Sequence, residues 1–399
     1  MKNKFVKGII EGTFLLSSTV TTTTVLLIVF FLFSEGSKIF TKSPVEGTNI
    51  VAVNTTAGIS ALTSAEIKNI YDQKIITWSE LGGSPDTIIR FTLNDISDYF
   101  TEEQTGSNFE RLPFLLDSLI DHTPGMIAVF SSDYLSKDFR SKIVPVKNIG
   151  LAQFLFGKEW LPTAQPAAQL GVLPLILGTL WVSLFAIIIA LPIGLATSIY
   201  MAEVASQQMR NLLKPVIELL AGIPSVVYGF FGLIVIVPAI QNLFNLPVGE
   251  TALAGSIVLA IMALPTIITV SEDAIRNTPR SIKEASLALG ANRWQTIRKV
   301  TLPYSASGIS AAAILGIGRA IGETMAVLMV TGNAAVIPNS LLQPVRTIPA
   351  TIAAELGEAP SGGLHYNALF GLGCILFIIT MIINLWVEYI SRKRKMSHS

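Results

Sequence analysis

Apolar stretches long enough to cross a lipid bilayer occur six times in this chain, and they constrain its fold more than any other feature. They lie near residues 13–33, 172–200, 213–240, 251–271, 308–331 and 367–390. A helix needs about 20 consecutive apolar residues to span the hydrocarbon core of a membrane. Hydrophobic residues make up 51% of the chain and charged residues only 14%, which is typical of membrane proteins. The sequence therefore predicts an all-α polytopic membrane protein with six transmembrane helices.

The basic residues predict which loops are cytoplasmic. They cluster at Lys2, Lys4 and Lys7, at Arg210 and Lys214, in the loop 276–299 and in the tail 392–395. The loop 241–250 has no Lys or Arg, and the loop 332–366 has only Arg346. Because Lys and Arg accumulate in cytoplasmic loops, we expect both termini to be cytoplasmic. We expect the basic tail to bind anionic membrane lipid, and we expect no nucleic-acid partner.

The first apolar stretch has a second interpretation, a cleaved signal peptide, because a basic start followed by an apolar run describes both. The run is long for a signal peptide, and no small-x-small cleavage site follows it in residues 34–43. We therefore expect a retained membrane anchor. The single cysteine, Cys374, lies in the last apolar stretch, which excludes an intrachain disulfide and favours a packing role.

A soluble stretch, residues 41–165, lies between the first two apolar stretches and is predicted to be extracytoplasmic. It is long enough to form a small folded domain. The spacing of Leu62, Ile67 and Ile70 predicts a short helix. Residues 88–91 read as a strand that follows the turn at Gly82-Gly83. We expect a small α/β insert domain here.

The loop between the fourth and fifth apolar stretches has a helix-turn-helix pattern. It contains Glu284-Ala285-Ser286-Leu287-Ala288-Leu289-Gly290, followed after nine residues by Val300-Thr301-Leu302-Pro303. Ile282, Ala285 and Leu289 share one helical face, so the first helix is amphipathic. Gly290 suits a helix end with left-handed backbone, and Asn292 is expected to cap a second helix that runs to Pro303.

Two ionisable residues, Arg319 and Glu323, lie within the fifth apolar stretch. Their spacing places them on one helical face, and charges at this depth mark a solute path unless they pair with each other. The guanidinium of Arg319 has planar, permanently charged donors for a hydrated oxyanion. Glu323 would accept a hydrogen bond from a protonated phosphate and would repel sulfate. The alternative is an Arg319–Glu323 ion pair that only holds helices together.

Small and polar residues accompany these charges. Gly316, Gly318 and Gly322 are expected to allow close helix packing, and Thr324 follows Glu323 directly. In the third stretch Ser225 follows Pro224, where a kinked, pore-lining helix and ordinary packing are equally good interpretations. We include Arg319, Glu323, Thr324 and Ser225 in the predicted substrate path.

The loop resembles the signature loop of ABC importer permeases, which has Glu-Ala-Ala, a Gly and a terminal Leu-Pro at the same spacing. The chain departs from that pattern at Ser286 and Val300, and both replacements are small. The resemblance implies the type I ABC importer permease fold and a helix that docks on an ATPase subunit. The residues that it places in this coupling are Glu284, Ala285, Ser286, Gly290, Leu302 and Pro303.

Residues 171–335 resemble, more specifically, the PstC-type permease subunit of bacterial phosphate ABC transporters. The segments that carry the resemblance are Leu177-Gly178-Thr179-Leu180, Tyr200-Met201-Ala202-Glu203, Gly222-Ile223-Pro224-Ser225, Leu264-Pro265-Thr266, the loop above and Gly318-Arg319-Ala320-Ile321-Gly322-Glu323-Thr324-Met325-Ala326-Val327. The resemblance implies import of inorganic phosphate by alternating access in the bacterial cytoplasmic (inner) membrane. The insert resembles part of the extracytoplasmic phosphate-binding proteins, but no Ser-Gly-Thr cradle follows Arg90, so docking or regulation is favoured over phosphate binding.

The resemblance also implies partners. They are a PstA-type permease that forms a heterodimer with this chain, two ATP-binding subunits and an extracytoplasmic phosphate-binding protein. The sequence has no Gly-x4-Gly-Lys-Ser/Thr loop, so we expect no cofactor in this chain, with ATP and Mg bound by the partner subunit. We therefore expect a transport subunit and no enzyme.

Two other functions stay open, a permease for another oxyanion and a membrane-anchored phosphate sensor. The sensor lacks an output domain, because the cytoplasm receives only short loops and a tail. Intramembrane catalysis is disfavoured because His122, His365 and His398 are scattered. The predicted parts are residues 1–40 with the first span, 41–165 as the insert, 166–391 as the permease core with its cytoplasmic loop 272–305, and the tail 392–399.

Overall fold

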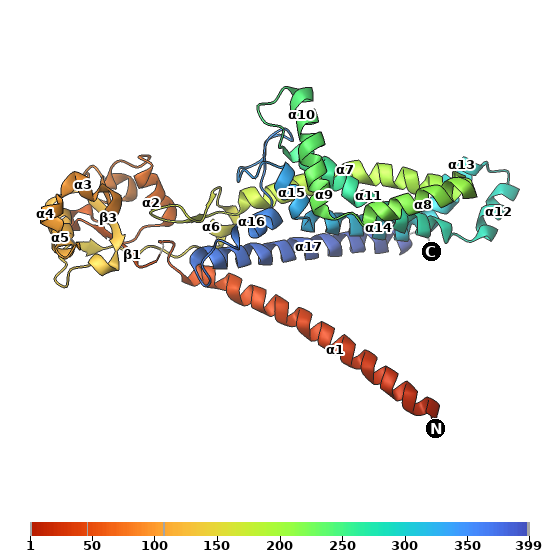
Figure 1. Ribbon diagram of the computed structural model, residues 1–399, viewed down its shortest axis with the longest axis horizontal. Coiled ribbons are helices and arrows are strands. Elements are labelled where there is room, and N and C mark those ends of the chain that lie inside the picture. The colour runs from red at the N-terminus through yellow and green to blue at the C-terminus, as the bar shows by residue number, and fades with distance from the viewer. Residues whose placement is uncertain (1, 46, 107, 397–399) are drawn as a thin grey trace. The chain divides into compact units, whose positions relative to one another are not determined.

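A computed structural model describes residues 2–45, 47–106 and 108–396 (Figure 1). The last three residues of the predicted basic tail lie outside this range. The chain divides into two compact units. The first comprises residues 1–172 and 359–371, and the second comprises residues 173–358 and 372–399.

The first unit begins with a long helix and continues into a small α/β domain. Its helices are α1 (Lys2–Ser37), α2 (Ser64–Tyr71), α3 (Ile96–Tyr99), α4 (Glu102–Thr105), α5 (Leu112–His122) and α6 (Leu151–Phe156). Its strands are β1 (Asn49–Val53), β2 (Ile89–Thr92), β3 (Met126–Ser131), β4 (Lys142–Ile143), β5 (Trp160–Leu161) and β6 (Gln169–Leu170). Short 3-10 turns cover Lys38–Thr41, Thr55–Ala57, Trp78–Leu81, Leu93–Asp95 and Ser132–Tyr134.

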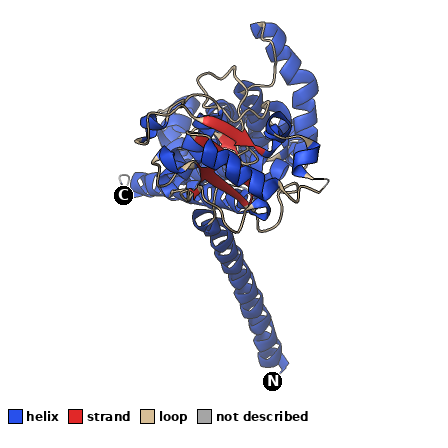
Figure 2. Cartoon of the chain, turned by 90° about the vertical axis from the view of Figure 1, so that its left-hand side faces the viewer, coloured by secondary structure: helices blue, strands red, loops and turns tan. Residues whose placement is uncertain are grey.

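A four-stranded sheet with the order β2-β3-β1-β4 forms the centre of the α/β domain (red arrows in Figure 2). Strand β3 pairs antiparallel with β1 and parallel with β2. Alternate residues of a strand point to opposite faces. Accordingly Val51 and Ile127 pack with α2 in one hydrophobic cluster, and Ala52 and Ala128 pack with α5 in another. Both faces of the sheet are therefore buried, which confirms the predicted small α/β region.

Helices make up the second unit. They are α7 (Leu173–Ile199), α8 (Gln207–Ala221), α9 (Ser225–Phe231), α10 (Val237–Phe244), α11 (Ala252–Arg276), α12 (Arg280–Ala288), α13 (Arg293–Thr296), α14 (Leu302–Gly322), α15 (Met325–Val330), α16 (Ile348–Glu355) and α17 (Leu364–Met396), whose first turns belong to the first unit. Three π-helical turns, η6 (Tyr200–Val204), η7 (Gly232–Ile236) and η8 (Ile297–Thr301), connect consecutive helices. In Figure 1, α12 and α13 lie at one end of this unit, and α15 and α16 lie toward the other.

Helix α11 is the central helix of the second unit and packs against both α7 and α14. Small residues allow these helices to approach closely. A Cβ atom added to Gly194 on α7, or to Gly316 on α14, would lie within 3 Å of the side chain of Ile267 on α11. This packing positions α14 next to α11, the helix that carries Thr266.

Among the described residues, six helices are long and apolar enough to cross a membrane, as the sequence predicts. Their bounds are Ile10–Thr41, Leu173–Val204, Ser225–Phe244, Ala252–Arg276, Arg293–Gly322 and Leu364–Tyr389. Many side chains on these helices are apolar and exposed, for example Phe14 on α1 and Leu184 on α7. Such a surface is typical of helices that contact lipid.

The prediction that the third span runs through residues 213–240 is wrong. The helix breaks between Ala221 and Ser225, and α8 is a separate helix. The cause is Pro224, which is extended at the N-terminus of α9 and disfavours helical geometry in the residue before it. The third span therefore begins at Ser225.

The structure corrects two further helix ends. The helix after Asn292 does not stop at Pro303, because Pro303 lies in the first turn of α14, where a residue without a backbone N–H is tolerated. The fifth span does not run continuously through residues 308–331, because α14 ends at Gly322 and α15 begins at Met325. Glu323, the predicted intramembrane carboxylate, lies between these two helices.

Candidate functional site

Arg319 lies in the last turn of α14 and is half-buried. Its Nη1 atom is 3.5 Å from Oγ1 of Thr266 on α11, a long hydrogen bond. Its charge also acts on Tyr228 of α9. No ion pair involves Arg319 in the part of the chain that the structure describes. A cation in an apolar span without a carboxylate partner is the arrangement that an anion path needs.

Glu323 does not share a helical face with Arg319, which corrects the expectation from their spacing. It follows the last residue of α14 and has extended backbone, with φ −73° and ψ 131°. The i,i+4 relationship holds only within a helix, so the bend at Gly322 removes it. The described residues show no Arg319–Glu323 ion pair, and the carboxylate of Glu323 is half-buried.

Thr324 begins the next helix segment. Its backbone carbonyl accepts the N–H of Leu328, and its hydroxyl lies 3.4 Å from the carbonyl oxygen of Gly322. Thr324 and Gly322 line a pocket of about 520 Å³ together with Pro349, Ile352 and other residues of α16 and its flank. The break in the helix therefore places Thr324 at an apolar cavity of the second unit.

Ser225 lies at the start of α9, half-buried and one turn before Tyr228. The hydroxyl of Tyr228 donates to the carbonyl oxygen of Leu220 at 2.8 Å, which holds the end of α8 against α9. Gly229 on the same helix packs on Ala326 of α15. Among the described residues no hydrogen bond or ion pair joins Ser225 to Arg319, whose side chain donates instead to Thr266.

The glycines around Arg319 do not all serve close packing. Gly316 packs on Ile267, as expected, but a Cβ atom added to Gly318 or Gly322 would have no neighbour within 4 Å in the described structure. Within the described part of this chain, no helix therefore packs on these two positions. The backbone on both sides of Arg319 borders open space.

The predicted coupling loop is two short helices joined at Gly290. Helix α12 ends at Ala288, and Gly290 has φ +86°, the left-handed geometry expected for it. The side chain of Asn292 accepts the N–H of Gln295 at 2.8 Å and so caps α13. The hydroxyl of Ser286 lies 3.0 Å from that of Thr296, which ties α12 to α13.

Most of the predicted coupling residues face outward. Glu284, Ala285, Gly290 and Pro303 are exposed, whereas Ser286 and Leu302 are half-buried. Leu289 is 90% exposed and Trp294 is 62% exposed. Exposed apolar groups of this size on a polar loop are the kind of surface at which another protein can dock. We call the surface formed by Ile282, Leu287, Leu289 and Trp294 the apolar loop surface.

Sequence reasoning did not find the charge pairs at the ends of the helices. Lys283 on α12 pairs with Glu203 in η6 at 2.5 Å. Glu272 on α11 is 1% exposed and pairs with Arg210 of α8 at 2.5 Å. The charged nitrogens of Lys214 and Arg276 each lie 3.9 Å from the same carboxylate. The partners in the two close pairs are 80 and 62 residues apart, so no local pattern indicates them.

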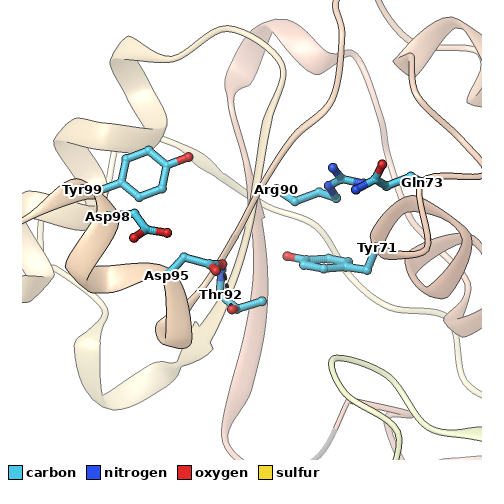
Figure 3. Close-up of a pocket in the computed structure, with 7 residues that line it drawn as sticks. All are labelled: Tyr71, Gln73, Arg90, Thr92, Asp95, Asp98 and Tyr99. Atoms are coloured by element: carbon cyan, nitrogen blue, oxygen red, sulfur yellow. Dashed lines mark hydrogen bonds between the residues drawn. The ribbon is translucent and has the colours of Figure 1, made fainter.

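The insert contains an open pocket of about 590 Å³ lined by Tyr71, Gln73, Arg90, Thr92, Asp95, Asp98 and Tyr99. Figure 3 shows Asp98 and Tyr99 on the side opposite Arg90 and Gln73. One oxygen of Asp95 already accepts the N–H and hydroxyl of Thr92, each at 2.8 Å. With two carboxylates to one guanidinium, this pocket does not favour a free anion.

Burial raises the pKa of the Tyr71 phenol in that pocket, and the nearby Asp95 raises it further. The phenol donates to the carbonyl oxygen of Phe91 at 2.8 Å. Tyr71 is therefore a neutral hydrogen-bond donor to the protein backbone and adds no charge to the pocket. Among the described residues, no cluster of His, Cys, Asp and Glu could hold a metal ion.

Residues 194–396 match the family model of the binding-protein-dependent transport system inner membrane component. The chain is 42% identical over 250 residues to the probable ABC transporter permease protein YqgH of Bacillus subtilis, covering 63% of this chain and 81% of that protein. It is 38% identical over 249 residues to the phosphate transport system permease protein PstC of Mesorhizobium japonicum, covering 58% and 75%. It is 35% identical over 291 residues to PstC of Haemophilus influenzae, covering 67% and 90%.

The matched region includes Arg319, the two-helix coupling loop and the last four of the membrane-spanning helices. The insert, residues 41–165, lies outside it. The chain is a multi-pass inner membrane protein and belongs to the family of binding-protein-dependent transport system inner membrane components.

Proposed function

We propose that this chain is the permease subunit of an ATP-driven importer that carries inorganic phosphate across the cytoplasmic membrane. One observation supports this more than any other: the guanidinium of Arg319 lies within an apolar span, without a carboxylate partner in the described structure. The similarity to PstC proteins indicates the substrate, because those relatives are phosphate transport permeases by name.

Arg319 binds the anion transiently during transport. Its hydrogen bond to Thr266 is long and has a neutral hydroxyl as acceptor, so an anion would replace a weak interaction with an ion pair. A site that held phosphate tightly would delay its release, and high affinity is better placed in a separate binding protein.

Glu323 selects among oxyanions. At neutral pH phosphate carries a proton that it can donate to a carboxylate, and sulfate does not. The position of Glu323 beyond the end of α14 separates it from Arg319 and leaves its carboxylate available to a substrate. Thr324 and Ser225 complete the proposed path as neutral hydroxyl groups. Thr324 lies in the bend between α14 and α15, and Ser225 lies at the start of α9.

The apolar loop surface binds an ATPase subunit in this proposal, and Glu284, Ala285, Ser286, Gly290, Leu302 and Pro303 shape or flank it. The chain itself binds no ATP or Mg. A PstA-type permease completes the membrane path as a heterodimer with this chain, and two ATP-binding subunits bind on the cytoplasmic side. The open space beside Gly318 and Gly322 fits a close helix of the second permease.

The insert docks or regulates an extracytoplasmic phosphate-binding protein. Its pocket carries the wrong balance of charge for a phosphate site of its own, because two carboxylates, Asp95 and Asp98, line it together with the one guanidinium of Arg90. The orientation with both termini in the cytoplasm, inferred from the basic residues, places the insert outside and the coupling loop inside.

The experiment that tests this function is radiolabelled phosphate uptake in cells that lack their own phosphate importer, with the partner genes supplied. Sulfate uptake is the control. Phosphate uptake that depends on this chain would support the proposal. Uptake of another oxyanion only would favour a different permease, and binding without uptake would favour a membrane-anchored sensor.

A further inference from the structure

A charge pair joins α12, the first helix of the coupling loop, to the turn η6 at the C-terminal end of α7. Nζ of Lys283 lies 2.5 Å from Oε1 of Glu203, and the two side chains are only 20% and 15% exposed. Exposed ion pairs contribute little because water screens them. Low exposure on both sides of this pair makes the attraction stronger, so α12 and the chain at Glu203 should move together.

Glu203 lies in the π-helical turn η6, which joins α7 to α8. The N–H of Ala205 returns to the carbonyl oxygen of Tyr200, and Ser206 then caps α8 by accepting the N–H of Met209. π-Helical turns are local irregularities that occur frequently at functional sites. A force applied to Glu203 therefore acts at the joint between two helices.

A second set of charges continues from α8 to α11. Arg210 pairs with the buried Glu272 at 2.5 Å, and Lys214 lies 3.8 Å from Asp273. Removing one partner of a buried pair leaves an uncompensated charge. These contacts join α8 and the C-terminal end of α11 into a rigid unit, and η6 connects that unit to α7.

Helix α7 reaches the turn that carries Arg319. The hydroxyl of Ser183 donates to the carbonyl oxygen of Ala320 at 3.4 Å. One turn earlier on α14, Gly316 lies against Ile187 of α7 and Ile267 of α11. Because packed interiors transmit displacement, a movement of α7 along its axis changes the surroundings of Arg319.

We propose that the Glu203–Lys283 pair transmits the movement of α12 to α7, and so couples ATP hydrolysis in the partner to opening of the path at Arg319. This inference rests on the proposed function and adds two positioning residues to it. The covalent connections of α12 to α11 and α14 persist when the pair is removed, so the variants are expected to fold and to dock the ATPase while transmitting motion poorly.

The test uses the full transporter, assembled with its partners in proteoliposomes, and measures phosphate transported per ATP hydrolysed. The variants are Glu203→Gln, Lys283→Gln, their double and the charge exchange E203K/K283E. We expect the ratio to fall about threefold or more in each single variant, the range of coupling between contacting residues. We expect the double to resemble the singles and the exchange to recover part of the ratio. Lys299→Gln, at an exposed lysine of the same loop, is the matched control.

Three results would overturn the inference. The ratio could stay unchanged in both single variants. Only the Lys283 variant could be impaired, which would make Lys283 a docking contact. Hydrolysis, transport and membrane abundance could fall in parallel, which would make the pair a stabilising contact only.

A second measurement does not depend on which anion is carried. Gln208 is exposed near the start of α8, so a Gln208→Cys variant with Cys374→Ala can be labelled with a maleimide, with and without ATP and vanadate. We expect nucleotide to change the labelling rate in the intact background and not with Glu203→Gln. A response that survives Glu203→Gln would contradict the inference. Absence of phosphate transport by the intact complex, with this response present, would contradict only the substrate in the proposed function.

Discussion

Nη1 of Arg319 lies 3.5 Å from Oγ1 of Thr266, so the cation at the end of α14 faces the central helix α11. The carboxylate four residues later is not its partner, because α14 ends at Gly322. In the proposed function, this separation leaves the charge of Arg319 for anion binding and the charge of Glu323 for selection between anions.

Replacement of Glu323 by Gln tests the selection. The neutral amide cannot repel a fully ionised anion as a carboxylate does, so we expect the preference for phosphate over sulfate to fall about tenfold, which corresponds to about 1.4 kcal/mol. The measurement is competition of sulfate against labelled phosphate uptake, with Glu250→Gln, outside the path, as the control. An unchanged preference would show that Glu323 does not contact the substrate.

The apolar loop surface gives a second prediction. Leu289 is 90% exposed, and in the complex it would be buried against the ATPase subunit. We expect Leu289→Asp to weaken ATPase binding at least about tenfold, as truncation of a central interface residue does. Affinity is measured by titrating the ATPase subunit onto detergent-solubilised permease. Gln208→Asp places the same charge on an exposed residue of α8 and should have no effect; equal losses would refute the docking surface.

The turn at Gly125 should require glycine for the insert to keep its stability. Gly125 has φ +78°, and an added Cβ atom would lie 2.3 Å from the carbonyl oxygen of Thr87. Trp78 Nε1 donates to the carbonyl oxygen of Gly125 at 3.0 Å, which fixes the turn. Gly125→Ala is expected to destabilise the insert by more than the ~1–2 kcal/mol of left-handed backbone strain.

The matched control for that turn is Gly82→Ala. Gly82 has φ +79° but no atom within 4 Å of an added Cβ, so only the backbone strain applies. Hydrogen exchange of the sheet amides in the full chain measures both variants. Equal loss of protection would show that the contact with Thr87 is relieved without cost.

Acid should loosen the insert near Glu80. The backbone N–H groups of Ile76 and Thr77 donate to its carboxylate and lower its pKa below the ordinary value. A lowered folded pKa means that the stabilisation is present above the unfolded carboxyl pKa and is lost as pH falls through the folded value. Glu80→Gln should therefore flatten the acid dependence of exchange protection, corrected for the intrinsic rate at each pH. If the pH dependence of exchange protection is unchanged in Glu80→Gln, other carboxyl groups cause the loss of protection in acid.

Local features of the sequence predict much of this structure. The six spans follow from apolar length, and the turn of the coupling loop follows from Gly290 and the cap residue Asn292. The failures have physical causes of two kinds. The break after Gly322 lies in a largely apolar stretch with no proline to indicate it. The Glu203–Lys283 pair joins residues that only the folded helices bring together.

Substitution of Arg319 tests the central claim most directly. Labelled phosphate uptake is compared for the intact chain, Arg319→Ala and Arg319→Lys, with partners present and at matched membrane abundance. The account predicts near-complete loss of uptake with Ala and partial activity with Lys, because an ammonium keeps the charge without the planar donors of the guanidinium, while ATPase binding stays normal. Uptake by the Ala variant equal to that of the intact chain would contradict the account and would make Arg319 a structural charge.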